Sequence, residues 1–201
     1  LDWAMVSKMD LEEAIAPTIE GEQNDYYTKF IQKYGYYDLF IIHPKGRVFY
    51  SVTKEADYGT NMIDGKFADS GLGKLVRGVL KTEEFGFADF EPYAPSNGEP
   101  AAFIAEPFIQ DGKVELIIAL QLSLEAINAI MTQREGMGET GETYLVGQDM
   151  LMRSDSYLDP EHHSVKASFA DPTLGNVDTE AARKALAGDT GEGIILDYNG
   201  Q

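Results

Sequence analysis

The stretch from Gly35 to Val52 constrains the fold more than any other, because it predicts two strands joined by a tight turn. Residues 36–42 are rich in aromatic and β-branched side chains, which suit a half-buried pleated surface. Residues 43–46, His-Pro-Lys-Gly, supply turn chemistry, since Pro fixes φ near about −65° and Gly accepts a positive φ. The alternation of apolar and polar residues from 47 to 52 then predicts a second strand that folds straight back as a hairpin.

Helix and strand patterns around the hairpin predict a single sheet. Tyr26–Tyr34 and Ser70–Leu80 carry apolar side chains at helical spacing, and Asp69 or Ser70 is the expected cap of the second helix. Three further strands and one helix are predicted, over Phe85–Tyr93, Ala101–Ile109, Lys113–Ser123 and Leu124–Glu135. Because consecutive strands are linked by hairpins, we expect an α+β fold with an antiparallel five-stranded sheet instead of βαβ units.

A less pronounced repeat of this order of predicted elements begins at Gly136. The sequence predicts a strand pair over Thr143–Val146 and Leu151–Ser154, a loop over Tyr157–Asp178, a helix over Thr179–Ala187 and a strand over Gly193–Tyr198. The order of hairpin, loop, helix and strand repeats that of residues 36–93. We therefore expect a second, partial module.

The first residues predict a separate strand and helix. Trp3–Met9 suits a short strand, Asp10 is a candidate helix N-cap, and Pro17 ends the helix. Residues 18–24 are polar and acidic, as in a linker. No basic region follows Leu1, so we expect no signal peptide and interpret the chain as a fragment.

The charge balance excludes some classes of function. The chain has 16 Lys and Arg against 34 Asp and Glu, a net charge of −18, whereas a nucleic-acid-binding protein needs a basic surface. The absence of Cys excludes disulfides, thiolate metal sites and Cys nucleophiles. No apolar run approaches the roughly 20 residues of a membrane span.

Several motifs in order resemble the double Cache sensor domains, whose modules are PAS-like. Residues 35–62, Asp69–Leu75 and Ala101–Phe108 resemble the membrane-distal module of that family. Residues 138–155 and Val177–Gly188 resemble the start and a later part of the membrane-proximal module. The resemblance implies a strand–helix segment with its linker over residues 1–22, a membrane-distal-type module over 23–135 and a partial membrane-proximal-type module over 136–201.

The resemblance also implies a function. Such domains are the extracytoplasmic sensor parts of chemoreceptors, sensor histidine kinases and diguanylate-cyclase receptors, tethered to the bacterial inner membrane. We therefore expect small-ligand sensing on the periplasmic or extracellular side, no enzymatic activity and no cofactor. The alternative is a sensor-shaped structural module that binds a partner protein or sets dimer geometry without any small ligand. A homodimer is one expectation, and a monomer is the other, because the chain lacks the long pairing helix of the family.

One segment departs from the order of the family. Residues 1–17 resemble the strand and helix that close the second module, yet here they come first. Three explanations stay open: the chain follows an earlier sensor module, it is rearranged or incompletely represented, or residues 1–9 pack as the last strand of the second module. In the third case Trp3 and Val6 would contact Tyr144, Val146 or Ile195.

The candidate ligand site lies on the concave face of the first sheet, where PAS-like modules hold small ligands. The candidate residues are Tyr50, Asp57, Tyr58, Arg77, Asp89, Glu91, Tyr93 and Glu106. Strand alternation would place Asp89 and Glu91 on one side with Phe87 and Tyr93, an arrangement that suits a cationic amine through charge and cation–π contact. The alternative is that this side is solvated. Glu106 would be either a buried pocket anion or an outward residue.

Other patterns give weaker predictions. The Arg, Trp and Tyr pattern with which double Cache domains bind amino acids is absent, so an α-amino acid ligand is not predicted. His162 and His163 are adjacent, and adjacent side chains make a poor chelate, so a polar loop is expected there. Residues 136–141, GMGETG, lack the Lys and Ser or Thr of a phosphate loop. No nucleophile and base occur in a recognisable motif.

Overall fold

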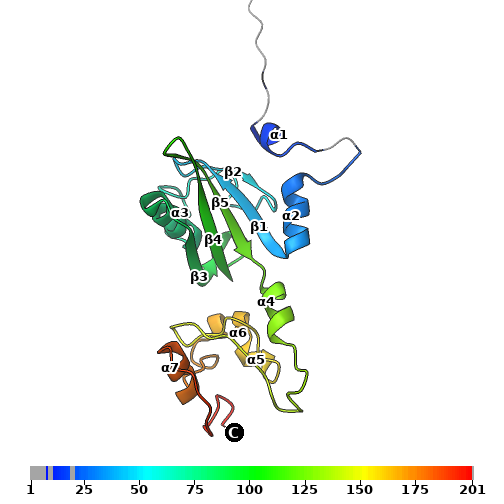
Figure 1. Cartoon of the computed structure of the whole chain (residues 1–201), viewed down its shortest axis with the longest axis vertical. Helices are drawn as coiled ribbons and strands as arrows, with labels where there is room; N and C mark the ends of the chain where they lie inside the picture. Colours follow the sequence, from blue (N-terminus) through cyan, green and yellow to red (C-terminus); the bar gives the residue numbers. More distant parts are fainter. Residues whose placement is uncertain (1–7, 9–10, 19–20, 201) are drawn as a thin grey trace, which may run out of the picture. The chain divides into compact units, whose positions relative to one another are not determined.

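The computed structural model describes residues 8, 11–18 and 21–200. Contacts within the chain divide it into two compact units, one that ends at Leu122 and one that begins at Ser123 (Figure 1). The expected module boundaries at residues 22 and 135 stay a prediction.

The first unit is built on a five-stranded antiparallel sheet, as expected. Its strands are β1 (Tyr36–Ile42), β2 (Val48–Ser51), β3 (Gly86–Tyr93), β4 (Glu99–Gln110) and β5 (Lys113–Leu122). They lie in the order β2-β1-β5-β4-β3, so β1 and β5 are central while β2 and β3 form the edges (Figure 1). This confirms the predicted α+β fold and the hairpin from which the prediction started.

Helices cover part of each face of this sheet. Helix α2 (Tyr26–Tyr34) begins at Asp25, whose carboxylate accepts a hydrogen bond from the Thr28 N–H, and ends at Gly35 with a φ of 73°. Helix α3 (Gly71–Thr82) begins at its N-cap Ser70. Helix α2 packs on one face of β1, and α3 lies on the opposite side of the sheet. Residues 39–42 are therefore all buried, whereas the sequence predicted a strand with only one buried face. A third helix, α1 (Leu11–Ile15), agrees with the prediction.

The β1–β2 turn depends on Gly46. Its φ is 90°, a left-handed conformation, and a Cβ there would overlap Asn61 Oδ1, which caps the backbone N–H groups of Ile63 and Asp64. We expect Gly46→Ala to lower the free energy of unfolding by about 2 kcal/mol, as judged by urea denaturation. The matched control is Gly78→Ala in α3, where a Cβ meets nothing within 4 Å. It should be neutral or stabilising by up to about 1 kcal/mol. Equal effects of the two substitutions would contradict the account.

Strand β3 corrects one prediction. Its pairing with β4 shifts register between Ala88 and Glu91, so the simple alternation breaks there. Asp89 and Glu91 are exposed, whereas Tyr93 is 1% exposed. The expected grouping on one side of the strand is therefore wrong for Phe87, which pairs with Ile104 and is 56% exposed, whereas Glu91, ion-paired with Lys74 of α3, and Tyr93 both lie on the side of α3.

The second unit is mainly helical within the described residues. Its helices are α4 (Leu124–Met131), α5 (Pro160–His163), α6 (Val165–Ala170) and α7 (Glu180–Leu186). Helix α7 is as predicted, with Thr179 as its N-cap, while α4 ends four residues before the expected Glu135. The expected loop over Tyr157–Asp178 is wrong, because the caps Asp159 and Ser164 start two short helices there.

The predicted strands of the second unit are mostly not formed. The strand pair around Gly147 is reduced to an isolated bridge between Val146 and Met152. Residues 193–198 form no strand, and Ile194 is fully exposed. A strand needs a neighbour for its backbone N–H and C=O groups, and the described part of this unit offers no sheet edge to residues 193–198.

Part of the N-terminal prediction lies outside the described residues. The predicted strand over Trp3–Met9 lies outside the described residues except for Lys8. Lys8 is exposed and belongs to no strand. The predicted helix cap Asp10 and the predicted contacts of Trp3 and Val6 with the second unit also lie outside the described residues. No helix among residues 11–18 and 21–200 is long and apolar enough to cross a bilayer.

Candidate functional site

Six polar side chains meet on the side of the sheet that faces α3. They come from four places: β1, β5, the segment of residues 52–70 between β2 and α3, and the end of β3 with the short 3₁₀ helix Ala94–Ser96. We call them the acidic site: Asp38, Glu55, Asp57, Tyr93, Ser96 and Gln121. Strand register brings the site together, because Asp38 and Gln121 are Cα partners on β1 and β5. We call residues 52–70 the covering segment, since Met62 and Phe67 pack into the core beside α3.

Asp38 holds the start of the covering segment. Its buried carboxylate accepts hydrogen bonds from the N–H groups of Val52 (2.9 Å) and Thr53 (3.2 Å). It also accepts from the hydroxyls of Ser51 (2.8 Å) and Thr53 (2.6 Å). Burial raises the pKa of Asp38, and these donors oppose that rise. Asp38 is thus a fully hydrogen-bonded anchor with a structural role.

Asp57 is the group whose hydrogen bonding is incomplete. Its carboxylate is fully buried, and Oδ2 accepts a hydrogen bond from the Tyr93 hydroxyl at 2.6 Å. Its other oxygen, Oδ1, has no hydrogen-bond partner among the described residues. Burial raises the pKa of Asp57 to about 6, the charges of Asp38 and Glu55 add to the rise, and the Tyr93 hydrogen bond opposes it. Near neutral pH this site therefore holds a buried negative charge with one oxygen unpaired.

A second unpaired acceptor belongs to Gln121. Its Nε2 donates to Ser96 Oγ at 3.3 Å, and Ser96 Oγ donates to Glu55 Oε2 at 2.7 Å. Because the Ser96 proton is used on Glu55, Ser96 can only accept from Gln121, which fixes the amide orientation. Gln121 Oε1 is then buried without a donor. The other Glu55 oxygen accepts from Tyr37, and this bond is the main cause that raises the pKa of Tyr37 to about 12.

The chemistry of the acidic site follows from these acceptors. A buried polar atom without a partner costs about 1–3 kcal/mol, and a buried charge costs more. Asp57 Oδ1 and Gln121 Oε1 both lack donors, and three carboxylates lie close enough for their charges to interact. A positively charged N–H group could satisfy an acceptor of this kind and offset the charge of Asp57. The site is closed, with Asp57, Tyr93 and Gln121 each at most 4% exposed, so such a ligand reaches it only when the covering segment moves.

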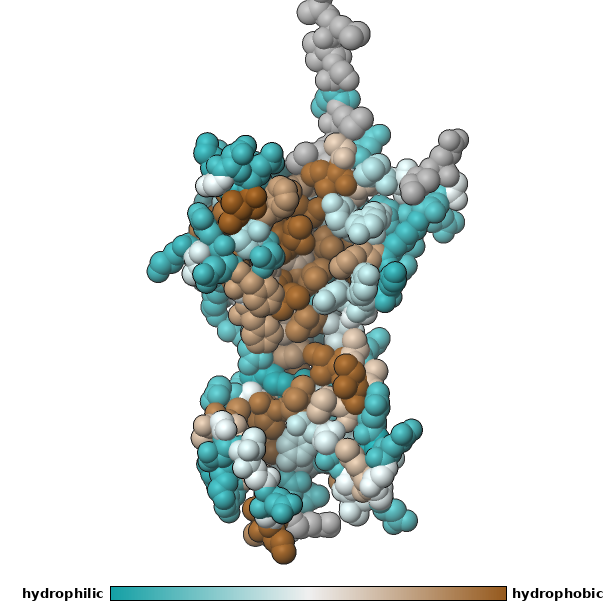
Figure 2. Space-filling view, viewed as in Figure 1, coloured by the Kyte–Doolittle hydropathy of each residue, from teal (hydrophilic) through white to brown (hydrophobic). Residues whose placement is uncertain are grey.

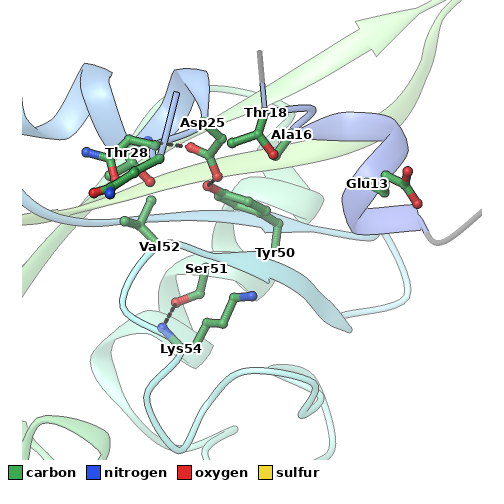
Figure 3. Close-up of a pocket in the computed structure, with 11 residues that line it drawn as sticks. Glu13, Ala16, Thr18, Asp25, Thr28, Tyr50, Ser51, Val52 and Lys54 are labelled. Carbon is green, nitrogen blue, oxygen red and sulfur yellow. Dashed lines mark hydrogen bonds between the residues drawn. The ribbon is translucent and has the colours of Figure 1, made fainter. Parts of the chain in front are cut away.

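Tyr50 lies on the other face of the sheet. Its buried hydroxyl donates to Asp25 Oδ2 at 2.6 Å, beside the first turn of α2. Figure 3 shows these two side chains pointing toward one another in a polar pocket of about 490 Å³ that Thr28, Ser51 and Lys54 also line. The structure therefore separates Tyr50 from Asp57 and Tyr93, because the sheet stands between them.

The remaining predicted residues have separate surroundings. Tyr58 is 37% exposed, with the Lys54 ammonium 5.7 Å from its ring centroid. Arg77 donates to the backbone carbonyls of Met62 and Ala68, and so ties α3 to the covering segment. Asp89 and Glu106 are exposed, and Glu91 forms an exposed ion pair with Lys74 at 2.9 Å. Of the eight predicted residues, Asp57 and Tyr93 belong to the acidic site.

Sequence reasoning did not propose four members of the acidic site: Asp38, Glu55, Ser96 and Gln121. Two of them left a signal in the sequence. Asp38 interrupts the apolar and aromatic strand β1, and Gln121 interrupts the apolar run of residues 116–122 in β5, each at a position that faces the core. A polar residue at such a position needs a buried partner, which marks it as unusual. Glu55 and Ser96 lie in irregular segments, where strand phase gives no such signal.

The adjacent histidines lie in the second unit. His163 is buried, with its ring 4.1 Å from that of Tyr198 and its Nδ1 2.8 Å from Asp159 Oδ2, whereas His162 is exposed. Among residues 11–18 and 21–200, no group of three or more His, Asp or Glu side chains is placed to hold a metal ion. The polar loop expected there is in fact the helix α5.

Comparisons with known proteins bear on the fold. No family model matches the chain. A curated protein, the probable chemoreceptor y4sI of Sinorhizobium fredii, is 27% identical over 129 residues, which are 63% of this chain and 16% of that protein. The chain thus spans less than a fifth of this relative.

Two solved structures are similar in fold to most of the chain. An extracellular ligand binding receptor from Desulfohalobium retbaense has a TM-score of 0.55 at 14% identity, over 83% of this chain and 27% of that chain. The sensory domain of the Campylobacter jejuni chemoreceptor Tlp3 has a TM-score of 0.51 at 12% identity, over 81% of this chain and 59% of that chain. The resemblance to double Cache sensor domains is therefore confirmed at the level of the fold.

Proposed function

We propose that this chain is an extracytoplasmic sensor module of a bacterial transmembrane receptor, of the chemotaxis or sensor-kinase type, and that its first unit binds a small cationic ligand. The fold and the chemoreceptor relative support the sensing role. One observation carries the ligand class: two buried acceptors, Asp57 Oδ1 and Gln121 Oε1, lack donors inside an acidic cluster. The ligand we propose carries a primary ammonium group.

The proposed mechanism couples the ligand to the covering segment. Asp38 holds the start of this segment and Arg77 its later part, while Asp57 lies between them. Ligand entry requires the segment to open, and a bound ammonium then pairs with Asp57 from within. A ligand changes a receptor only through its different affinities for two states. Here the two states are the covering segment open and the covering segment closed, and the ammonium group binds the closed state more tightly because only that state surrounds it with the buried acceptors.

A melting screen with matched amines tests the proposal. A primary alkylammonium and its quaternary trimethyl analogue have the same charge, but only the first donates hydrogen bonds. We expect the primary amine at 100 times its Kd to stabilise the protein by roughly 2.7 kcal/mol, and the quaternary analogue to do much less. A broad amine and metabolite panel that leaves Tm unmoved would overturn ligand binding and favour a purely structural module.

Ligand binding is also expected to depend on pH. Because the pKa of Asp57 is about 6 in the free protein, the carboxylate is charged above that pH and neutral below it. The Kd for a primary amine should be constant above about pH 7 and rise by about tenfold per unit below pH 6. Isothermal titration calorimetry between pH 5 and pH 8, chosen as about one unit on either side of this range, measures the effect. A flat profile would place the amine away from Asp57.

A further inference from the structure

Five residues of the covering segment, 54–58, lie between two anchored points of the chain, and we call them the flap. Before the flap, Asp38 accepts hydrogen bonds from the backbone N–H groups of residues 52–53. After the flap, residues 59–60 form two backbone hydrogen bonds with Val48 of β2, each of 2.9 Å. Because both flanks are fixed, the flap can move without the rest of the covering segment.

The flap is also the polar border of the acidic site. Its side chains alternate, with Lys54, Ala56 and Tyr58 exposed, Glu55 half-buried and Asp57 buried. Figure 2 shows apolar side chains gathered in a band over the strands of this unit, and an apolar surface offers no hydrogen bonds to a cation that has lost its water. The route for a cation to Asp57 therefore lies beneath the flap.

Tyr37 holds the flap to the sheet from outside the acidic site. Its side chain is 43% exposed, and its hydroxyl donates to Glu55 Oε1 at 2.7 Å. We call this hydrogen bond the latch. The other oxygen of Glu55 accepts from Ser96 at 2.7 Å. One carboxylate of the flap is thus joined both to β1 and to the short helix after β3.

An irregularity in β1 places Tyr37 where it can act as a latch. The Cα partner of Tyr36 on β5 is Leu122. Two residues further along β1, Asp38 has its partner at Gln121, only one residue away. Tyr37 is therefore an extra residue in this strand pair. An extra residue of this kind bends the strand and redirects side chains, and such irregularities are frequent beside functional sites.

The backbone at the start of the flap has the conformation of a hinge. Lys54 has a φ of 51°, in the left-handed region that non-glycine residues rarely adopt. Such a conformation persists where neighbouring contacts hold it, and here the Lys54 N–H donates to Ser51 Oγ at 3.1 Å. The hinges of lids are positions of this kind, at which a change of φ and ψ is absorbed.

We propose that the flap is the gate of the acidic site and that Tyr37 is a positioning residue that sets how fast a ligand enters and leaves. The inference rests on the proposed function, because a gate acts only on a ligand that enters. The latch is formed in the closed state both with and without ligand. Its loss should therefore raise the rates of association and dissociation by the same factor and leave the Kd unchanged.

Tyr37→Phe removes the latch hydroxyl and keeps the ring. Stopped-flow tyrosine fluorescence with a primary alkylammonium should give association and dissociation rate constants that are each about tenfold higher, as expected for the loss of one hydrogen bond to a carboxylate. The matched control is Tyr34→Phe, at a side chain on α2 that is 58% exposed, which should change neither rate. Unchanged rates in Tyr37→Phe, or a change in the Kd alone, would overturn the proposal.

Hydrogen exchange in the ligand-free protein tests the latch without any amine. The flap amides should exchange about tenfold faster in Tyr37→Phe, whereas Gly59, whose N–H bonds to Val48, should be unchanged. If the flap exchanges faster but no amine binds, the latch is supported and the ligand class proposed above is wrong. If amines bind but exchange of the flap is unaltered, the latch is wrong and the ligand class is supported. Cooperative melting curves show that the variants fold.

Discussion

Replacement of Asp57 by Asn is expected to stabilise the ligand-free protein at neutral pH and to abolish amine binding. Burial raises the pKa of Asp57 from 3.8 to about 6, so its charged form is costly in the folded state. Because the folded state then binds a proton more tightly than the unfolded state, stability falls as pH rises from about 4 to about 6 and stays reduced above. At about 1.4 kcal/mol per pKa unit, Asn should recover up to about 3 kcal/mol at pH 7.

The pH dependence of the free energy of unfolding separates the removal of the buried charge of Asp57 from other effects of the Asn side chain. Urea denaturation of wild type and Asp57→Asn should give nearly equal stabilities near pH 4 and a growing difference toward pH 7. The control Asp64→Asn removes an exposed carboxylate from the same covering segment and should leave the profile unchanged. A variant less stable than wild type at pH 7 would contradict the account. Retained affinity for a primary amine would show that Asp57 is not the binding group.

Replacement of Asp38 by Ala is expected to have the largest effect in the opposite direction. Ala would remove the acceptor of the Thr53 N–H and of the hydroxyls of Ser51 and Thr53. It would also remove one of the two acceptors of the Val52 N–H, which keeps its 3.3 Å hydrogen bond to the Leu39 carbonyl. Each buried donor without a partner costs about 1–3 kcal/mol, offset in part by removal of a buried charge. We expect a loss of about 3 kcal/mol in the free energy of unfolding.

The isosteric variant Asp38→Asn is the control. Its carbonyl oxygen can accept from the backbone N–H groups, and its amide can donate to the hydroxyls of Ser51 and Thr53. We expect it to cost about 1 kcal/mol in the same urea titration. If Ala and Asn cost the same, the hydrogen bonds of Asp38 are not what holds the covering segment. Hydrogen exchange at Val52 and Thr53 should rise in Ala and much less in Asn.

Strong local patterns in the sequence predicted most of the first unit. The Tyr36–Ile42 strand and the Tyr26–Tyr34 helix begin and end where expected, because Asp25 and Gly35 supply caps that act within a few residues. The second unit was predicted less well. Short helices such as α5 depend on one cap and one Pro, and residues 193–198 have the composition of a strand but no described neighbour to pair with.

The acidic site was predicted only in part. Asp57 and Tyr93 were among the candidates, but strand alternation had grouped Tyr93 with Phe87, Asp89 and Glu91, and Glu106 was a separate candidate that the structure leaves exposed. The register shift in β3 breaks that alternation, and such a shift leaves no clear mark in the residues. Tyr50 was assigned to the wrong face, since the β1–β2 pairing contains a shift as well.

The sequence by itself determined the hairpin at Gly35–Val52, the antiparallel sheet and the resemblance to a sensor, because turn residues, caps and hydrophobic period are local properties. The tertiary structure alone decided which acids are buried and which are solvated. Burial depends on which strands become neighbours, and Asp38 and Gln121 meet only through the pairing of β1 with β5. The tertiary structure also decided that Glu106 is exposed, since only packing shows which part of a sheet the helices leave uncovered.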